Sequence, residues 1–389
     1  MSSCRLPAAF AAAGARVGVL ATAESLMCKT RHMAVRFPLS DTLNARRLLA
    51  ELEDAVARFT PDLLVPCDEQ ALWFLEHCRA HAGRVGLARV SAGLQACLTR
   101  SLGRLDTLPQ RTIKPLTQQL ARELGLRAPR DIEAFTPGEA RAAARQLGFP
   151  VVVKRPRSCG GSGVRICRTL EELDAACAQW MRPRSLRRRL KARLLERGWM
   201  EPSTHVSVQP YVEGKLAVTC AAAWEGRTLG VLAAMAERQA RDILPADVLR
   251  YTDRRDLIET SAKMVAAFGA TGFVSFDFLI DSQNEAWLLE CNARPTPILP
   301  FGPRAGLDLA RLFLEAIAGE DARLRDKDIA TVSEPARVAL FPQALIPGAP
   351  DAELRATWHG VPWDDPHLLR ALLVRLRTAR QHQARQNAA

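Results

Sequence analysis

The stretch WLLECNARP, residues 287–295, places a glutamate and an asparagine two positions apart at the end of an apolar run. Side chains of a strand point alternately to its two faces. This alternation predicts one face that carries Leu288, Glu290 and Asn292 and another that carries Trp287, Leu289 and Cys291. A carboxylate and a carboxamide side by side offer the oxygen ligands that suit a hard cation such as Mg²⁺. The alternative for this stretch alone is a strand end that frays into solvent.

The preceding segment FVSFDFLID, residues 273–281, predicts a partner strand that joins the first through a hairpin around SQN. Alternation places Ser275, Asp277 and Leu279 on one face of this strand. If that face is the one that carries Glu290 and Asn292, the hairpin presents three oxygen ligands. Such a set can hold Mg²⁺ or Mn²⁺ and leave positions for phosphate oxygens and water. An aspartate that accepts hydrogen bonds from backbone amides is the alternative.

Composition indicates a globular protein of two or three domains. The chain has 389 residues, of which 48% are hydrophobic and 25% charged, both ordinary values for globular proteins. No apolar run reaches membrane-spanning length and no basic segment precedes a hydrophobic one at the N-terminus, so we expect a cytoplasmic protein with no membrane partner. The ten cysteines include no CxxC pair and lie mostly in apolar segments, which predicts reduced, buried thiols.

Positive charge is concentrated in two places. Residues 182–197, RPRSLRRRLKARLLER, carry eight Lys or Arg and one acid. The C-terminal tail carries Arg370, Arg375, Arg377, Arg380 and Arg385 without an acid between them. Such runs can bind nucleic acid, but neither has interleaved aromatic residues. A solvated basic helix is therefore the favoured interpretation of both.

The first hundred residues alternate helical and apolar extended patterns. The pattern predicts helices over 5–14, 43–59 and 69–78 and strands over 15–21, 62–66 and 84–90. This alternation is typical of a small parallel α/β layer. A layer of this kind normally begins with a buried strand, whereas this sequence starts almost directly at a helix. Either the first strand is absent or the true start lies upstream.

The remainder predicts a mixed α+β region. We expect helices over 112–130, 138–148 and 255–272, a strand, glycine-rich turn and strand over 149–168, and antiparallel strands over 206–238. Within this region Lys154 ends the apolar run VVVK, and a buried ammonium requires an anionic partner. The loop SCGGSG, residues 158–163, is rich enough in glycine to approach a phosphate closely. Lysine and loop together indicate a nucleoside triphosphate, although neither GxxxxGK[ST] nor GxGxxG is present.

The order of these parts resembles the ATP-grasp superfamily, in its carboxylate–amine ligase type. The resemblance rests on Lys114 before a helix that ends in ELGL, then FPVVVK, GGSG, VQPYVEG, Asp277 and ECNAR. It implies an α/β protein with an N-terminal parallel α/β layer over 1–108. A two-subdomain α+β ATP-grasp fold would follow over 109–320, divided into 109–208 and 209–320, with a helical C-terminal extension over 321–389.

The resemblance also implies roles for individual residues. Lys114 and Lys154 would contact the phosphates and the adenine edge, and Arg294 would face the transferred phosphate, which makes Lys154 and Arg294 the catalytic candidates. Asp277, Glu290 and Asn292 would bind two Mg²⁺. The remaining ATP contacts would be a loop with Ser158, Gly160, Gly161 and Gly163, a hinge with Gln209, Tyr211 and Val212, and an apolar floor at Leu279.

Two positions depart from the family pattern. The adenine hinge starts with Gln209 where the family often has glutamate. Leu216 stands where an acid often holds the ribose hydroxyls, with Glu213 as a substitute. The ribose contacts are therefore the part of the resemblance with least support.

The function implied is an ATP-dependent ligase that joins a carboxylate to an amine through an acyl phosphate and releases ADP and phosphate. Its partners would be small-molecule acids and amines, with a homodimer as one expected assembly. A biotin- or bicarbonate-dependent carboxylase and a small-molecule kinase are alternatives on the same fold, and a nucleic-acid-binding protein is a weaker one. Four arginines are candidates to hold an anionic substrate, with surface solvation as the alternative for each: Arg238, Arg241, Arg250 and Arg254.

Overall fold

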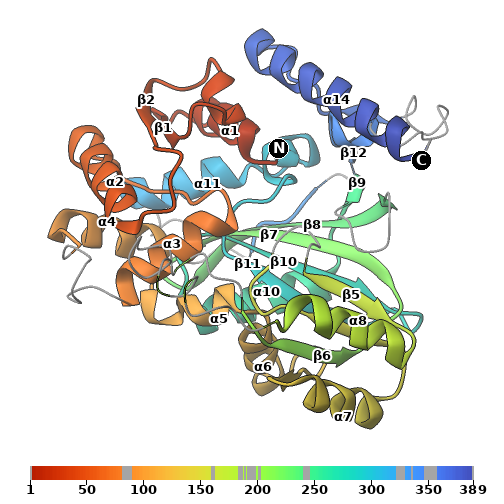
Figure 1. The fold of residues 1–389 in the computed structure, drawn as a ribbon. Helices are drawn as coiled ribbons and strands as arrows, with labels where there is room; N and C mark the ends of the chain where they lie inside the picture. The colour runs from red at the N-terminus through yellow and green to blue at the C-terminus, as the bar shows by residue number, and fades with distance from the viewer. Residues whose placement is uncertain are drawn as a thin grey trace.

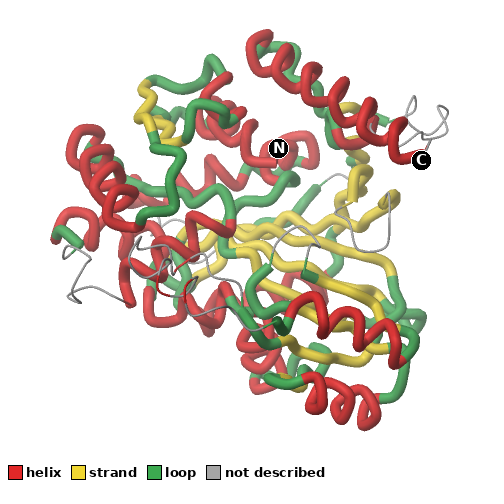
Figure 2. The backbone as a smooth tube through the Cα atoms, viewed as in Figure 1, coloured by secondary structure: helices red, strands yellow, loops and turns green. Residues whose placement is uncertain are grey.

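The computed structural model describes residues 2–80, 90–158, 163–182, 203–239, 246–320, 329–333, 336–345 and 357–387, together with Arg187, Leu190 and Trp199. Its strands form a two-stranded, a four-stranded and a seven-stranded sheet. In Figures 1 and 2 the seven-stranded sheet lies in the middle of the molecule, with the N-terminal helices on one side and the four-stranded sheet on the other. None of the described helices is long and apolar enough to cross a bilayer.

The N-terminal part combines short helices with two parallel strands. Its elements are η1 (Ser2–Arg5), α1 (Leu6–Ala12), β1 (Gly18–Ala21), η2 (Leu26–Lys29), β2 (Val35–Pro38), α2 (Ala45–Phe59), α3 (Glu69–Ala80) and α4 (Ala92–Leu102). β1 pairs with β2 in parallel. Asn44 caps α2 by accepting a hydrogen bond from the Arg47 amide at 2.9 Å. The predicted parallel α/β arrangement is therefore present, although its sheet is small.

The strand predicted over 62–66 does not form. The segment has no regular secondary structure and is not part of a sheet. The backbone amide of Leu64 instead donates to the Ser101 hydroxyl on α4 at 2.8 Å. A side chain thus replaces the neighbouring strand that its apolar sequence suggested. The strand predicted over 84–90 falls almost entirely outside the described residues.

Two elements, η3 (Leu105–Thr107) and α5 (Leu108–Thr112), lead into the four-stranded sheet. The strands of this sheet are β3 (Ile132–Ala134), β4 (Val151–Lys154), β5 (Val164–Cys167) and β6 (Val206–Pro210). The helices of the same segment are α6 (Lys114–Glu123), α7 (Pro137–Leu147) and α8 (Leu170–Trp180). The strand order is β3-β6-β4-β5, and every pair is antiparallel. One face packs against α7 and α8 through Val151, Val153 and Val208. Because side chains alternate, Lys154, Ser207 and Gln209 belong to the other face.

The seven-stranded sheet contains β7 (Lys215–Trp224), β8 (Arg227–Gln239), β9 (Ala246–Thr252), β10 (Gly272–Ile280), β11 (Ala286–Asn292), β12 (Arg337–Ala339) and β13 (Trp358–His359). Its order is β11-β10-β7-β8-β9-β12-β13. One face packs on α10 (Arg255–Phe268) through a core that includes Phe268, Phe276 and Phe278. The opposite face packs on η5 (Leu299–Ala305), α11 (Leu309–Glu315) and α1. The predicted antiparallel strands and hairpin are confirmed.

The last helix, α14 (Pro366–Asn387), follows η6 (Ala316–Glu320) and η7 (Gln343–Leu345) in the described chain. It lies beside the N-terminal helices (Figure 1), where Leu368 and Leu372 pack with Leu26 of η2. The arginine-rich tail is thus helical, as predicted. Most of the basic segment 182–197 lies outside the described residues.

A bulge in the β10–β11 hairpin corrects the face predicted for Leu288. Asp277 pairs with Glu290, but the register then shifts so that Phe278 pairs with Leu288. Residues paired in an antiparallel ladder share a face, so Leu288 lies on the apolar face with Phe278 and not beside Glu290. It is fully buried in the core beneath α10. The strict alternation assumed for 287–292 therefore fails at one point, although Glu290 and Asn292 keep their predicted face.

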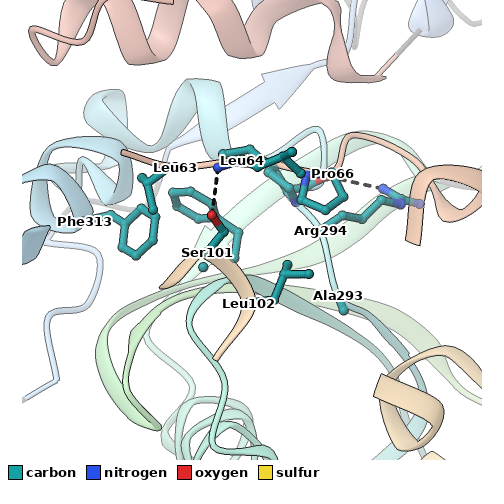
Figure 3. A pocket seen from close by; sticks show the side chains of 12 residues that line it. Leu63, Leu64, Pro66, Ser101, Leu102, Ala293, Arg294 and Phe313 are labelled. Carbon is teal, nitrogen blue, oxygen red and sulfur yellow. Dashed lines mark hydrogen bonds between the residues drawn. The ribbon is translucent and has the colours of Figure 1, made fainter. Parts of the chain in front are cut away.

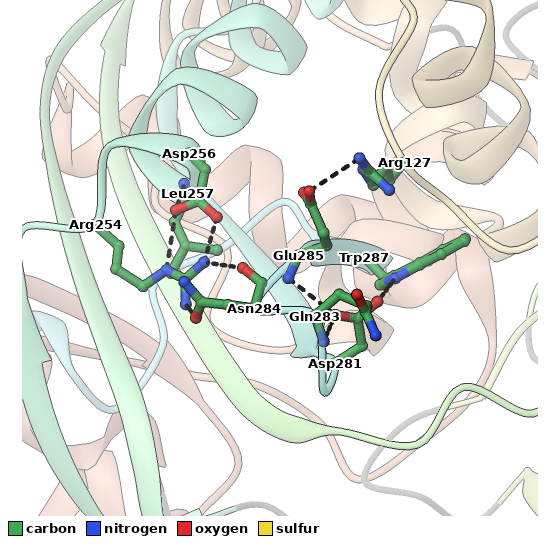
Figure 4. A network of polar contacts seen from close by, with 9 residues as sticks. All are labelled: Arg127, Arg254, Asp256, Leu257, Asp281, Gln283, Asn284, Glu285 and Trp287. Atoms are coloured by element: carbon green, nitrogen blue, oxygen red, sulfur yellow. Dashed lines mark hydrogen bonds and ion pairs between the residues drawn. The ribbon is translucent and has the colours of Figure 1, made fainter.

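The turn of this hairpin is held by the polar network of Figure 4. The Asp281 carboxylate accepts hydrogen bonds from the backbone amides of Gln283 and Glu285 at 2.9 Å and from the Trp287 indole at 2.8 Å. Arg254, just before α10, donates to the side-chain and backbone oxygens of Asn284 at 2.7 and 2.8 Å. These bonds fix the turn and the adjoining pairing of residues 278–280 with 286–288, as far as the bulge.

Candidate active site

Two carboxylates face one another on adjacent strands at the centre of the site. Asp277 of β10 lies directly opposite Glu290 of β11, and Ser275 lies opposite Asn292. Asp277, Glu290 and Asn292 are partly exposed, whereas Phe276 and Phe278 on the other face are fully buried. The hairpin therefore presents the three predicted oxygen-bearing side chains on one face.

Asp277, Glu290 and Lys114 shift one another's pKa values. Burial, followed by the negative charge of Glu290, raises the pKa of Asp277 to about 8. Burial acts to raise the pKa of Glu290 as well, but the ammonium of Lys114 outweighs it and lowers that pKa to about 2. Lys114, at the start of α6, forms an ion pair with Glu290. Burial acts to lower the pKa of Lys114, but Glu290 and Asp277 raise it above its ordinary value.

The donor set of this face fits Mg²⁺. Two carboxylates and a carboxamide provide hard oxygen ligands, and Mg²⁺ is commonly held by one or two carboxylates with phosphate oxygens and water. Among the described residues, no three His, Cys, Asp or Glu side chains cluster as metal ligands. A third protein ligand on this face would be an amide oxygen, which Asn292 carries opposite Ser275.

The second predicted lysine lies on the polar face of the four-stranded sheet. Lys154 ends β4, pairs with Ser207 of β6, and is only 5% exposed. Burial lowers its pKa, and Lys114 adds to this effect, while Asp131 opposes it. The structure thus places both predicted lysines in buried positions near the carboxylate pair, as their mutual electrostatic influence shows.

The base of the glycine loop is closed by backbone contacts. The Arg155 amide donates to the Gly163 carbonyl at 2.8 Å. A Cβ on Gly163 would lie 2.3 Å from the Cβ of Ser158, so only glycine fits here. Ser158 and Gly163 therefore sit at the two ends of the predicted loop. Gly160 and Gly161 lie outside the described residues.

The chain passes from one large sheet to the other where the adenine hinge was predicted. β6 ends at Pro210, and the Tyr211 amide donates to the Pro150 carbonyl at 3.2 Å. Val212 follows, and β7 then begins in the seven-stranded sheet. Buried Gln118 of α6 donates to the Gln209 side chain at 3.3 Å and to the Leu289 carbonyl at 2.7 Å. The hinge is thereby tied to the strand that carries Glu290.

Leu279 is partly buried and lies on the same strand face as Asp277. A position on that face agrees with the apolar floor predicted for it. Gly214, at the start of the passage into β7, has no room for a side chain, because a Cβ would lie 2.5 Å from the Ile280 carbonyl oxygen. The hinge therefore runs in close contact with the end of β10.

Arg294 reaches the N-terminal part of the protein. Its side chain is 14% exposed and forms an ion pair with Glu69, the first residue of α3. It also contacts the Asn292 side-chain oxygen at 3.5 Å. Arg294 therefore stands beside the proposed metal ligands, with a guanidinium oriented by a residue that the sequence reasoning did not select.

The cavity beside Arg294 is too small for an organic substrate. Figure 3 shows Leu63, Leu64 and Pro66 on one side of it and Arg294 on another. Its volume is about 10 Å³, which is enough for roughly one water molecule. The cavity lies where residues 63–66 contact the start of β10 and residues 293–295 just after β11, and it does not identify a substrate.

Three of the four arginines suggested for substrate binding already have acidic partners. Arg238 binds Asp247 through two hydrogen bonds of 2.9 Å. Arg250 pairs with Glu237, and Arg254 binds Asp256 at 2.5 Å. Their charges are therefore balanced within the protein, and the alternative of structural or surface roles is favoured. Arg241 lies outside the described residues.

Two acids of α3 were missed by sequence reasoning. Glu69 binds Arg294, and Glu76 binds Arg157 at 2.8 Å while accepting a hydrogen bond from Thr112 at 2.9 Å. Both acids are buried or partly buried on a helix whose pattern predicted only packing. The available signal was the acidic pair Asp68 and Glu69 directly after an apolar run.

The fold and these side chains define a nucleotide-binding class, and comparison with known proteins identifies the family. The family described as carbamoyl-phosphate synthase L chain, ATP binding domain, matches residues 114–320, more than half of the chain. The chain belongs to this family, within the ATP-grasp superfamily. As a member of this family, the chain carries an ATP-binding domain.

Three known proteins illustrate the similarity. The carbamoyl phosphate synthase large chain of Rubrobacter xylanophilus is 26% identical over 217 residues, 54% of this chain and 19% of that protein. The formate-dependent phosphoribosylglycinamide formyltransferase of Anaeromyxobacter dehalogenans is 25% identical over 295 residues, 72% of this chain and 68% of that protein. The crystal structure of an L-amino acid ligase from Bacillus licheniformis has a TM-score of 0.57 at 16% identity and covers 81% of this chain and 72% of that chain. The chain thus spans about a fifth of the length of the large synthase.

Proposed function

We propose that the protein is an ADP-forming ligase that activates a small carboxylic acid as an acyl phosphate and transfers the acyl group to an amine. The observation that carries the proposal is the opposed pair Asp277 and Glu290, flanked by Asn292, Lys114 and Arg294. This set matches the demands of phosphoryl transfer, which needs positioned positive charge and metal ligands but no side-chain nucleophile. The names of the relatives above, which include an amino acid ligase and a formate-dependent enzyme, agree with such chemistry.

Each group of site residues would have its own role in this reaction. Asp277, Glu290 and Asn292 would hold Mg²⁺, which when bound neutralises phosphate charge. Lys114 and Lys154 would hold the phosphates, and Ser158 to Gly163 would shield them from water. A substrate carboxylate oxygen attacks the γ-phosphorus, and the bond to the β–γ bridging oxygen breaks to release ADP. The amine then attacks the acyl carbon and phosphate leaves, while Arg294 binds the developing negative charge.

The domain boundaries, the adenine contacts and the assembly are also proposed. We assign an N-terminal domain to residues 1–108, an ATP-grasp domain to 109–320 with subdomains 109–208 and 209–320, and a C-terminal extension to 321–389. The two larger sheets support a division near residue 210, since the segment after β6 leads into β7, whereas β12 and β13 of the C-terminal extension continue the seven-stranded sheet. Gln209, Tyr211, Val212 and Leu279 would hold adenine. The assembly would be a homodimer that acts on small molecules in the cytoplasm.

Hydroxylamine trapping tests the reaction. The protein is incubated with MgATP, hydroxylamine and, in turn, each of a panel of amino acids and other small carboxylic acids. Acid-dependent hydroxamate with equal amounts of ADP and phosphate would support the ligase. AMP and pyrophosphate would overturn it. ADP formed only with bicarbonate would indicate the carboxylase, and a stable phosphorylated product without need of an amine would indicate the kinase.

A further inference from the structure

The polar face of the four-stranded sheet carries a second acid close to Lys154. Lys154 pairs with Ser207, and Ser207 pairs on its other side with Glu133 of β3. Asp131 precedes Glu133 by two residues and directly precedes β3. Alternation therefore places Asp131 on the same face as Lys154. None of the roles assigned above uses Asp131.

Both charges on this face lack strong partners. The two carboxylate oxygens of Asp131 are shielded from solvent and form no ion pair within the described residues. Burial raises the pKa of Asp131, while Lys154 and the Ser207 hydroxyl oppose this shift. Lys154 is 5% exposed and forms no ion pair within the described part of the chain. Lys114, by contrast, is matched by Glu290. Isolated buried charges are costly, so their retention together on one face indicates a functional reason.

We propose that Asp131 is a positioning residue that supplies the counter-charge for Lys154 and keeps its ammonium charged and directed towards the nucleotide phosphates. The inference rests on the nucleotide site of the proposed function. No ion pair joins Asp131 and Lys154 within the described residues, so Asp131 acts on the ammonium without occupying its donors, which can then serve phosphate oxygens.

The surrounding charges make Asp131 the dominant anion for this lysine. Burial lowers the pKa of Lys154, and Asp131 is the strongest influence that opposes the shift. Lys114 also lowers this pKa, whereas Glu290 and Asp277 act weakly in the other direction. Since Glu290 is bound to Lys114, loss of Asp131 leaves Lys154 without a comparable acid. Its charged form then becomes harder to maintain in the buried site.

A double-mutant cycle on nucleotide affinity tests the inference. Calorimetry would measure the Kd of MgADP for the wild type, Asp131→Asn, Lys154→Met and the double variant. We expect Asp131→Asn to weaken binding about tenfold. It should have little effect once Lys154→Met is present, because the carboxylate acts through the ammonium. Glu133→Gln is the matched control, since its half-exposed carboxylate lies on the same strand beside His205 at 3.4 Å.

The outcomes separate this inference from the proposed function. The inference would be overturned if Asp131→Asn weakened MgADP binding equally in the wild type and in Lys154→Met. Unchanged or tighter MgADP binding by Asp131→Asn would also overturn it. A wild type that binds no MgADP would instead contradict the nucleotide site itself. Thermal unfolding without nucleotide checks that each variant is folded. If Asp131→Asn is not folded, Asp131→Ser enters the same cycle with the same criteria.

Discussion

Glu69 and Arg294 form an ion pair although 225 residues separate them in the chain. The pair joins the start of α3 to the end of the strand that carries Glu290 and Asn292. Seven residues further along α3, Glu76 binds Arg157, the residue before the glycine loop begins at Ser158. Residues seven apart lie on one face of a helix, two turns from each other. One helix of the N-terminal part therefore holds arginines beside both Asn292 and the start of the glycine loop.

The first prediction concerns the orientation of Arg294. In Glu69→Gln the guanidinium loses its buried counter-charge, so it should occupy several positions instead of one. We expect hydroxamate formation to slow about tenfold, equivalent to about 1.4 kcal/mol of barrier, with little change in the KM for ATP. Asp54→Asn is the control because Asp54 and Arg58 form an exposed pair, 61% and 65% exposed. A normal kcat in folded Glu69→Gln would contradict the role.

The second prediction concerns the metal ligands. Glu290→Gln replaces one carboxylate oxygen by an amide nitrogen, which does not ligate Mg²⁺, and it removes the partner of Lys114. We expect a folded protein whose Mg²⁺-dependent turnover has fallen about 100-fold or more. Glu285→Gln, on the same hairpin, removes only the exposed pair with Arg127 and should remain active. Ordinary Mg²⁺-dependent turnover in Glu290→Gln would rule out this metal site.

Alternation alone was enough to predict that Asp277, Glu290 and Asn292 share one face, because this depends on the local geometry of two neighbouring strands. The same reasoning misplaced Leu288, since a bulge is set by how two strands pair and not by either sequence alone. Glu69 could not be found in this way, because its role depends on a contact across the molecule. The apolar segment 62–66 failed as a strand for the same reason, since Ser101 binds its backbone in place of a neighbouring strand.

The third prediction concerns stability and pH. Burial acts to raise the pKa of Glu237, but Arg250 and Arg337 outweigh it and lower the pKa below its ordinary value of 4.5. A carboxyl group whose pKa is lowered by folding stabilises the folded state above its unfolded pKa. That contribution disappears as pH falls through the folded pKa.

Glu237→Gln should therefore unfold at lower denaturant concentration than the wild type at pH 7, with the difference shrinking as pH drops below about 4.5. Urea unfolding at several pH values measures this change. Glu315→Gln serves as control, because Glu315 pairs with an arginine, Arg311, that is 72% exposed. A difference between Glu237→Gln and wild type that stays constant from pH 7 to pH 3 would show that the arginine contacts do not act through charge.

The last prediction concerns the anchor of the glycine loop. Glu76 has a side chain only 9% exposed, and its two oxygens are both used, one by Arg157 at 2.8 Å and one by Thr112 at 2.9 Å. The carboxylate thus ties α3 to the residue before Ser158 and to the end of α5.

Glu76→Gln keeps the shape of the side chain and its bond to Thr112 but removes the charge that holds Arg157. Because Arg157 and the adjoining Ser158, a proposed ATP contact, would then be less firmly positioned, we expect the KM for ATP to rise about fivefold while kcat changes less. Thr112→Val, which removes only the other bond to Glu76, should leave the KM for ATP within about twofold. Equal effects of both variants on the KM, or an effect of Glu76→Gln on unfolding without any on ATP, would show that Glu76 serves packing alone.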